Sequence, residues 1–479
     1  MLNPLGQIRF GSLASSVSFR SLGLGFAWSW AWTLWASLSS LSGNVELGVA
    51  SSPAWIAALA SGIAALPLGN WALATHRLSL APHWVILAAA LAGGSSLALG
   101  LCTLVQLPHA YFVLCGVAAG IGTALLYLLW TVAFSRAPRM RSAIVIPLNA
   151  AITALPITII SGSTLLAAWA FTAVLPIISA CMLFFFTKKD VVEEAAVSER
   201  SAINAKSAFI FLQAPTGALC SLAALVGVVS GSSALSGAIA TEPFEGVFAL
   251  ISTFVALLIA LATYNRSPGA PAPDYLHWAL SLAAIGSLCY LQWIGALQLV
   301  GIALFRIAEV LAFIFTFTFA LAQLPQGRAF SLTTVTALLT ATQAGSLIGN
   351  LAGTWWGSAY EGAGGFMLVC LFASLCLVFE LFAKESGVRH FRAINHVAPA
   401  ASDDIDAVCD AIARTYSLAP RQRDVLVHLA QGRTVARIGQ TLIMSENTVA
   451  SYVKQIYARL GVHSKQELID FVQCYRALD

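Results

Sequence analysis

Residues 418–461 have the sequence LAPRQRDVLVHLAQGRTVARIGQTLIMSENTVASYVKQIYARLG, and this stretch carries the strongest structural signals in the 479-residue chain. Pro420 suits the first position of a helix, and Gly432 suits a position just past a helix end. Ser445 can cap a later helix, which we expect to stop at Gly461. The stretch therefore predicts three short helices in succession.

The two later helices of this stretch are predicted over 435–442 and 446–460, and a fourth helix is predicted over 465–475. Four short helices around one small core, with a tight turn between the middle two, form a helix-turn-helix arrangement. The expected core consists of apolar side chains at helical spacing: Val425, Leu426, Leu429, Ile438, Leu442, Val449, Val453, Ile456, Leu460, Leu468 and Val472.

The segment from Leu418 to Val472 resembles the LuxR/GerE-type DNA-binding domain nearly end to end. The matching positions are Ser445-Glu446-Asn447-Thr448-Val449, Ile456, Leu460-Gly461-Val462 and Ser464. Ala450 and Tyr452 stand where that family usually has Lys and His, and Ala419 replaces its usual Thr cap. The resemblance implies a DNA-binding domain over 417–479 that binds double-stranded DNA as a homodimer, with the last helix at the dimer contact.

The charge of this segment fits a DNA partner. Residues 420–465 contain seven Lys or Arg and two Asp or Glu, and phosphate contacts supply most of the affinity for DNA. A solvated charged face is the alternative explanation for some of the arginines. The side chains expected at the DNA are Ser445, Asn447, Thr448, Ser451, Lys454, Arg437 and Lys465.

The rest of the chain is too apolar to be soluble. The whole sequence is 58% hydrophobic and 10% charged, against about 25% charged residues in soluble domains. Residues 1–397 hold 16 Lys or Arg and 12 Asp or Glu, whereas the 82 residues from 398 onward hold nine of each. Composition excludes a secreted disulfide scaffold, a disordered chain and a coiled coil, and favours a membrane domain with a small soluble tail.

Windows of about 20 apolar residues predict twelve membrane-spanning helices. They lie near 20–40, 54–75, 84–104, 110–134, 142–162, 164–186, 208–230, 243–264, 275–296, 298–323, 330–356 and 363–383. The fold class is therefore all-α, with a polytopic bundle over 1–384 that has halves at 20–186 and 208–384 and a connector at 187–207. Residues 385–416 are expected to be a linker and a lead-in helix. The 6+6 layout resembles the major facilitator superfamily, whose two halves enclose a midplane site.

The distribution of basic residues predicts the orientation in the membrane. With the N-terminus in the cytoplasm, every Lys and Arg between the predicted spans falls in a cytoplasmic loop, whereas the opposite loops contain none. The positive-inside rule then places both termini in the cytoplasm of a bacterial cell, with the bundle in the inner membrane. Its immediate partner is the lipid bilayer.

Two groups of side chains in the spans are candidates for binding a small-molecule signal. Arg306 and Glu309 lie at i, i+3 in the tenth segment, close enough to pair, and ionisable groups in a bilayer are costly. A structural ion pair is the alternative. Trp28 and Trp32 share a face of the first segment with Trp35. These rings could form an aromatic wall for a ligand, and packing or a position at the membrane interface is the alternative.

Small and sulfur-containing residues of the spans are expected to pack rather than react. Gly345, Gly349 and Gly353 repeat every four residues, a spacing that lets helices approach closely. Nine cysteines are scattered without metal-ligand spacing, and we expect them to be small buried residues. No cofactor motif, metal site or catalytic residue is predicted.

Three functions fit the sequence. The first is a membrane-embedded one-component transcription regulator that senses a signal through the spans and binds DNA through the tail. The second is a major-facilitator-like transporter with an appended DNA-binding regulatory domain, although the acidic residue of the family's loop after the second helix is missing between Gly69 and Arg77. The third is a membrane anchor without sensing. None of them is an enzyme.

Overall fold

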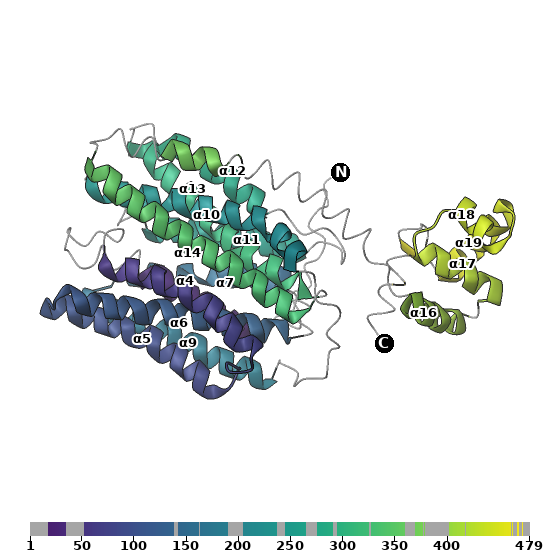
Figure 1. Ribbon diagram of the computed structural model, residues 1–479, viewed down its shortest axis with the longest axis horizontal. Coiled ribbons are helices and arrows are strands. Elements are labelled where there is room, and N and C mark those ends of the chain that lie inside the picture. Colours follow the sequence, from purple (N-terminus) through teal and green to yellow (C-terminus); the bar gives the residue numbers. More distant parts are fainter. Residues whose placement is uncertain are drawn as a thin grey trace, which may run out of the picture. The chain divides into compact units, whose positions relative to one another are not determined.

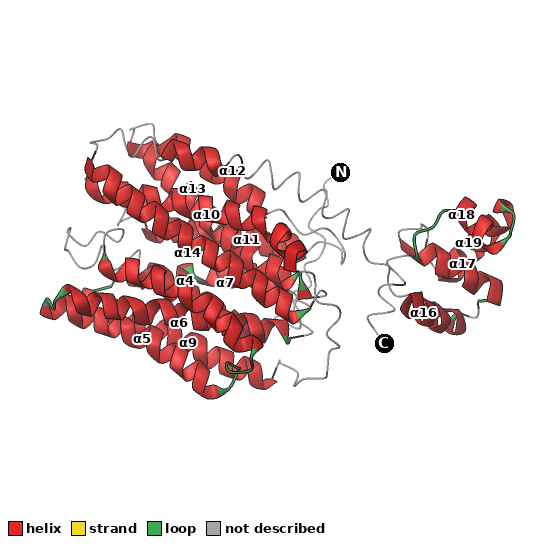
Figure 2. Cartoon of the chain, in the orientation of Figure 1, coloured by secondary structure: helices red, strands yellow, loops and turns green. Residues whose placement is uncertain are grey.

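The computed structural model describes residues 18–34, 52–137, 142–161, 163–189, 205–236, 245–264, 275–290, 295–324, 327–359, 369–376, 378, 402–416, 418–460, 462, 467–468 and 472. Within these ranges every regular element is a helix, as Figure 2 shows. The chain divides into two compact units, and the main division falls between Gly387 and Val388. The prediction of an all-α membrane bundle followed by a small helical domain is confirmed.

The membrane unit begins with the helices of the predicted first half. These are η1 (Phe19–Leu22), α2 (Gly23–Trp32), α4 (Pro53–Ala74), α5 (Pro82–Val105), α6 (His109–Ser135), α7 (Ser142–Ile152), α8 (Ala154–Ser161) and α9 (Leu165–Lys189). The fifth predicted span is thus two helices. Pro156 explains the break, because a proline nitrogen has no hydrogen to donate to the carbonyl of Ile152 four residues earlier.

The second half has a matching series of helices. These are α10 (Ala205–Ser236), α11 (Glu245–Tyr264), α12 (Tyr275–Tyr290), α13 (Gly295–Leu321) and α14 (Arg328–Ala359). Residues 369–376 are helical and fall within the twelfth predicted span, much of which lies outside the described residues. Among the described residues, eight helices are long and apolar enough to cross a membrane.

The two halves of the membrane unit contact one another along two seams. α14 packs against α4, and α11 packs against α7 and α8. α13 also reaches α6 and α7 of the first half. Figure 1 shows α14, in green, beside α4, in purple. Side chains of α13 therefore also take part in the contact between the two halves.

Glycines permit the closest helix contacts in this unit. A Cβ atom built on Gly345 or Gly349 of α14 would lie 2.1 Å from the carbonyl oxygen of Cys220 or Ala224 of α10. The packing role predicted for these two glycines is confirmed, because any side chain there would force the two helices apart. Gly116 of α6 has the same relationship to Ala54 of α4.

The C-terminal unit contains α16 (Ser402–Thr415), α17 (Pro420–Ala430), α18 (Val435–Leu442) and α19 (Glu446–Leu460). Residues 467–468 and 472 are helical, and the rest of the predicted fourth helix lies outside the described residues. The expected core is confirmed, with Leu442 and Val453 at its partly buried margin. The core also includes Val408, Cys409 and Ile412 of α16, so the lead-in helix packs with the helix-turn-helix.

Candidate nucleic-acid interface and intramembrane polar cluster

The turn between α18 and α19 places α19 against the rest of the C-terminal unit. α18 ends at Leu442 and is followed by Ile443, whose φ of 55° is left-handed. The N–H of Met444 donates to the carbonyl of Gly439 at 2.9 Å. The N–H of Thr448 donates to Oγ of Ser445 at 3.1 Å. Ser445 therefore caps α19 as predicted, which gives this serine a structural role whether or not it also contacts DNA.

One face of α19 is buried and the other is available to a partner. Val449, Ile456 and Leu460 lie in the core. The exposed side chains of this helix include four of the predicted DNA contacts: Asn447, Thr448, Ser451 and Lys454. Amide, hydroxyl and ammonium groups can bond base edges or phosphates in a major groove, which is wide enough to admit a helix. The outer face of α19 is thus the candidate nucleic-acid interface.

The two remaining predicted contacts have different outcomes. Arg437 is exposed on α18, and its Nη1 donates to Oε1 of Gln440 at 3.2 Å. Its guanidinium keeps further donors for a phosphate. Lys465 lies outside the described residues.

Gln422 joins α17 to α19. Its Oε1 accepts from the N–H of Ala419 at 2.9 Å, which is the half of a capping box that needs no side-chain acceptor at Ala419. Its Nε2 donates to Oε1 of Gln455 on α19 at 2.6 Å. Gln422 is buried, so both bonds satisfy polar atoms that have left water.

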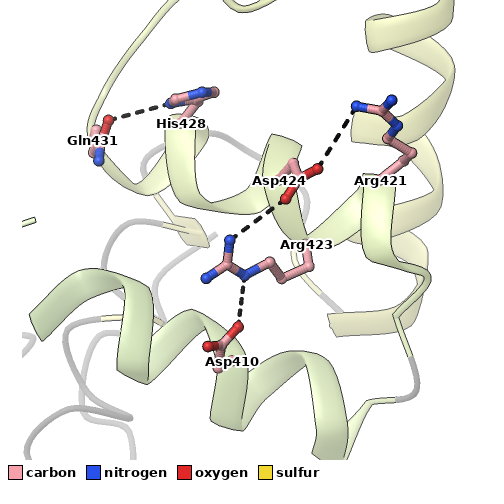
Figure 3. Close-up of polar contacts among 6 residues, drawn as sticks. All are labelled: Asp410, Arg421, Arg423, Asp424, His428 and Gln431. Carbon is pink, nitrogen blue, oxygen red and sulfur yellow. Dashed lines mark hydrogen bonds and ion pairs between the residues drawn. The ribbon is translucent and has the colours of Figure 1, made fainter. Parts of the chain in front are cut away.

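A charged network joins α17 to α16, as Figure 3 shows. Arg423 Nε lies 2.6 Å from Oδ1 of Asp410 on α16, and Arg423 Nη1 lies 3.5 Å from Oδ1 of Asp424. The hydrogen bond from Arg423 to Asp410 raises the pKa of the guanidinium. Burial, with a smaller contribution from the Asp406 carboxylate, raises the pKa of the nearby Cys409 thiol to about 12.

In the membrane unit, the structure brings the predicted ion pair together. Arg306 Nη1 lies 2.9 Å from Oε2 of Glu309, near the middle of α13. The guanidinium carbon of Arg306 also lies 5.2 Å from the ring centroid of Trp32 on α2, within the range of a cation–π contact. Both charged side chains are partly accessible, at 19% for Arg306 and 34% for Glu309. The ion pair and the cation–π contact partly compensate these charges, which are costly inside a bilayer.

Aromatic rings continue this cluster along the same face of α13. Trp28 of α2 stacks on Phe313 with ring centroids 3.7 Å apart, and lies 5.9 Å from Trp32. Tyr127 of α6 contacts Phe313 edge-on at 6.5 Å. Rings from the first half therefore pack directly on a helix of the second half.

Sequence reasoning missed Tyr127 and Phe313 in this cluster. Positions 306, 309, 313 and 317 are separated by three or four residues, so they share one face of a helix. This spacing was visible in the sequence and could have indicated Phe313 and Phe317. Nothing local to Tyr127 indicates a contact across the halves, because α6 is apolar over its whole length.

Among the described residues, no group of three or more His, Cys, Asp or Glu side chains could hold a metal ion.

Comparison with known proteins supports two assignments. The family profile "Bacterial regulatory proteins, luxR family" matches residues 416–472. A protein of Pseudomonas aeruginosa strain PAO1, named as a transcriptional regulator, is 44% identical over 57 residues, which are 12% of this chain and 28% of that protein. The chain spans less than a third of the length of the curated relatives that it matches.

The membrane unit resembles solved transporter structures in fold. The human organic anion transporter MFSD10 superposes with a TM-score of 0.53 at 13% identity, over 78% of this chain and 99% of that one. A peptide transporter POT superposes with a TM-score of 0.51 at 13% identity, over 79% and 99%. Residues 416–472 thus form a LuxR-family helix-turn-helix DNA-binding domain, and most of the chain has a major-facilitator-like transporter fold.

Proposed function

We propose that this chain is a membrane-embedded one-component transcription regulator of a bacterial inner membrane. In this proposal residues 1–384 form the membrane domain, 385–416 the linker and lead-in helix, and 417–479 the DNA-binding domain, with both termini in the cytoplasm. The observation that carries it is the exposed polar face of α19 on a chain in which eight of the described helices are long and apolar enough to cross a membrane.

The proposed DNA contacts are the α19 side chains Asn447, Thr448, Ser451 and Lys454, with Ser445 at the helix start. Arg437 and Lys465 would add phosphate contacts, which supply affinity without sequence preference. In this proposal two copies bind double-stranded DNA as a homodimer through the last helix, around Leu468–Val472. Half-sites one helical turn apart would then be occupied by the two α19 helices.

The proposed sensor is the cluster of Arg306, Glu309, Trp28 and Trp32, which would bind a small-molecule signal. The cluster joins α2 and α13, so a ligand that displaces either contact would change how the two halves pack. Such a ligand biases the equilibrium between two arrangements of the bundle, provided that it binds one of them more tightly.

Binding of DNA is tested with residues 398–479 and duplex DNA at several salt concentrations. We expect Lys454→Ala to weaken binding across sequences and to lower the salt slope by about one. Arg414→Ala, which removes the same charge from α16, is the matched control and should leave both quantities unchanged. Unchanged affinity and slope in Lys454→Ala would remove that side chain from the interface.

Sensing is tested after chromatin capture of the intact protein has identified its DNA sites and neighbouring genes. Candidate signals chosen from those genes are added to cells with a transcriptional reporter. We expect Trp32→Ala and Glu309→Gln to abolish the response. Trp278→Ala, which removes a 60% exposed tryptophan from α12, should retain it. A full response in both cluster variants would show that the signal does not act through this cluster. An unaltered chain that occupies its DNA sites but responds to no candidate signal would support an anchor without sensing.

The second candidate function is a transporter with an appended DNA-binding regulatory domain. The fold of the membrane unit is the observation that favours it. Uptake of the same candidate signals by vesicles that contain the purified chain separates the two functions. Accumulation that Glu309→Gln abolishes would favour transport, whereas signal-dependent DNA occupancy without accumulation favours the regulator.

A further inference from the structure

The turn between α18 and α19 exposes one large apolar side chain. Ile443 is 94% exposed, and among the residues of the C-terminal unit that the structure describes it is the only large apolar side chain that is exposed. Its neighbours Leu442 and Met444 are partly buried against the core of this unit. Ile443 therefore gains almost none of the stabilisation that burial gives to an apolar side chain.

The backbone at Ile443 also argues against a role in folding. Its φ of 55° lies in the left-handed region, where a residue branched at Cβ is an outlier and where asparagine or glycine is accommodated more readily. Neither burial nor backbone conformation accounts for isoleucine at this position. Because strained residues gather at functional sites, the exposed side chain of Ile443 indicates contact with a partner.

Ile443 borders an open hollow of about 480 Å³ between α18 and the start of α19. We call this surface the α18–α19 corner, and its lining residues are Ala436, Gly439, Gln440, Ile443, Met444 and Glu446. The four proposed DNA contacts in the body of α19 are absent from this lining. We therefore expect the hollow to stay accessible when the outer face of α19 lies in a major groove.

The charge and the position of the corner indicate the chemistry of its partner. Among the described residues that line the hollow, Glu446 is the only charged one, and its carboxylate repels DNA phosphates. The start of α19 is the end that enters the groove in helix-turn-helix proteins, so a partner at the corner is close to the duplex. Proteins that bind DNA present Lys and Arg, which complement Glu446.

We propose that the α18–α19 corner is a docking surface for a different protein that is bound to the same DNA. An apolar side chain of that protein enters the hollow beside Ile443, and a neighbouring Lys or Arg pairs with Glu446. This step rests on the proposed function, because it requires that α19 lies on DNA. The contact is small, and binding of both proteins to one duplex raises their effective concentration enough for it to form.

Docking is separated from DNA binding by measuring both in intact cells that express the full chain. Chromatin capture gives the DNA occupancy, and transcripts from the occupied sites give the regulatory effect. We expect Ile443→Asn and Glu446→Gln to keep the occupancy while they reduce the regulatory effect about fivefold or more, as loss of a central interface contact does. Asparagine suits the left-handed backbone, so this variant is expected to fold.

Two control variants accompany these substitutions. Ile443→Leu keeps an apolar side chain at the corner and should retain most of the regulatory effect. Asp410→Asn removes a half-exposed carboxylate of α16 that does not line the hollow, and it should leave occupancy and regulation unchanged.

A photocrosslink identifies what lies against the corner. Ile443 is replaced by p-benzoylphenylalanine in the full chain, and the cells are irradiated. We expect a crosslink to a protein other than this chain. Glu446→Gln should lower its yield by weakening the contact, and Lys454→Ala should lower it in proportion to the loss of DNA occupancy.

Four results would overturn the proposal. Unchanged regulation in Ile443→Asn and Glu446→Gln, or absence of a crosslinked protein, would exclude docking at the corner and leave the proposed regulator intact. A crosslink to DNA, or lost occupancy in Ile443→Asn, would make Ile443 a DNA contact. A crosslink between two copies would make the corner a self-association surface. If the unaltered chain occupies no DNA site, the proposed function fails and the docking surface fails with it.

Discussion

Arg423 of α17 and Asp410 of α16 form an ion pair in which Nε and Oδ1 are 2.6 Å apart (Figure 3). This contact joins the LuxR-family domain, matched from residue 416, to a helix that precedes the match. The apolar side of the same helix contributes Ile412 and Cys409 to the core. α16 is therefore part of the folded C-terminal unit, in addition to following the linker from the membrane unit.

Burial of Ile412 should stabilise the packing of α16 on the C-terminal unit more than the Arg423–Asp410 ion pair does. Ile412 is fully buried, so Ile412→Ala should lower the free energy of unfolding of residues 398–479 by about 2–5 kcal/mol. Asp410 is half exposed and Arg423 is 29% exposed, so Asp410→Ala should lower it by only about 0–1 kcal/mol. Urea denaturation measures both values. A larger loss in Asp410→Ala than in Ile412→Ala would contradict this order.

The buried Cys409 thiol should make the C-terminal unit less stable at alkaline pH. Its pKa rises from an ordinary value near 9 to about 12, first because burial disfavours the thiolate. Between these values the folded state keeps a proton that the unfolded state loses, so the free energy of unfolding falls by up to about 1.4 kcal/mol per pH unit. The stabilisation is fully present below about pH 9.

The measurement is urea denaturation of residues 398–479 from pH 8 to pH 11, compared with Cys409→Ala. The difference between the two proteins isolates the thiol from the lysines and tyrosines that also titrate in this range. We expect the variant to lose less stability than the parent over the interval. Parallel pH profiles would show that the thiol ionises equally in the folded and unfolded states.

Two serines of α19 and its cap are expected to have different roles, because Ser445 caps the helix whereas Ser451 is a proposed DNA contact. Ser445→Ala removes the acceptor of the Thr448 N–H and should cost about 1 kcal/mol of stability. Ser451 is exposed in the middle of α19, so Ser451→Ala should change stability by less than that while weakening DNA binding. Thermal denaturation and DNA titration of both variants test the distinction, and equal stability losses would refute it.

The close contact of α10 with α14 at Gly349 can be tested with a substitution of that glycine and a control substitution of Gly94 in α5. In Gly349→Ala the new Cβ would lie 2.1 Å from the carbonyl oxygen of Ala224, whereas a Cβ at Gly94 meets nothing within 4 Å. We expect Gly349→Ala to lower the unfolding temperature of the detergent-solubilised full chain. Gly94→Ala should keep or raise it, because alanine favours a helix by about 1 kcal/mol over glycine. Equal unfolding temperatures would contradict the packing account.

Much of the C-terminal unit was predictable because its signals are local. The observed bounds of α18 and α19 agree with the predicted ranges 435–442 and 446–460. Gly432 takes a left-handed φ of 79°, as expected of a residue just past a helix end. The exposed positions on α19 follow from the buried positions by helical periodicity. Packing of α16 onto α17 was not predicted, since an amphipathic helix does not indicate which neighbour covers its apolar face.

The arrangement of the membrane unit was predictable only in part. Hydropathy indicated apolar helices, eight of which are long and apolar enough to cross a membrane among the described residues, and i, i+3 spacing indicated the Arg306–Glu309 pair. Helices that are apolar on all sides carry no pattern that distinguishes a lipid-facing from a buried face. The stacking of Trp28 on Phe313 depends on packing between helices, so it was not available from the sequence.

The most direct test of the central claim is recovery of DNA with the chain while it is still in the membrane. Intact cells are crosslinked, membranes are isolated and washed, and the DNA bound to the full-length chain is sequenced. We predict discrete sites whose enrichment falls in Lys454→Ala, at equal amounts of membrane-embedded protein. Absence of enriched sites, or a profile unchanged by Lys454→Ala together with Thr448→Ala, would contradict the account.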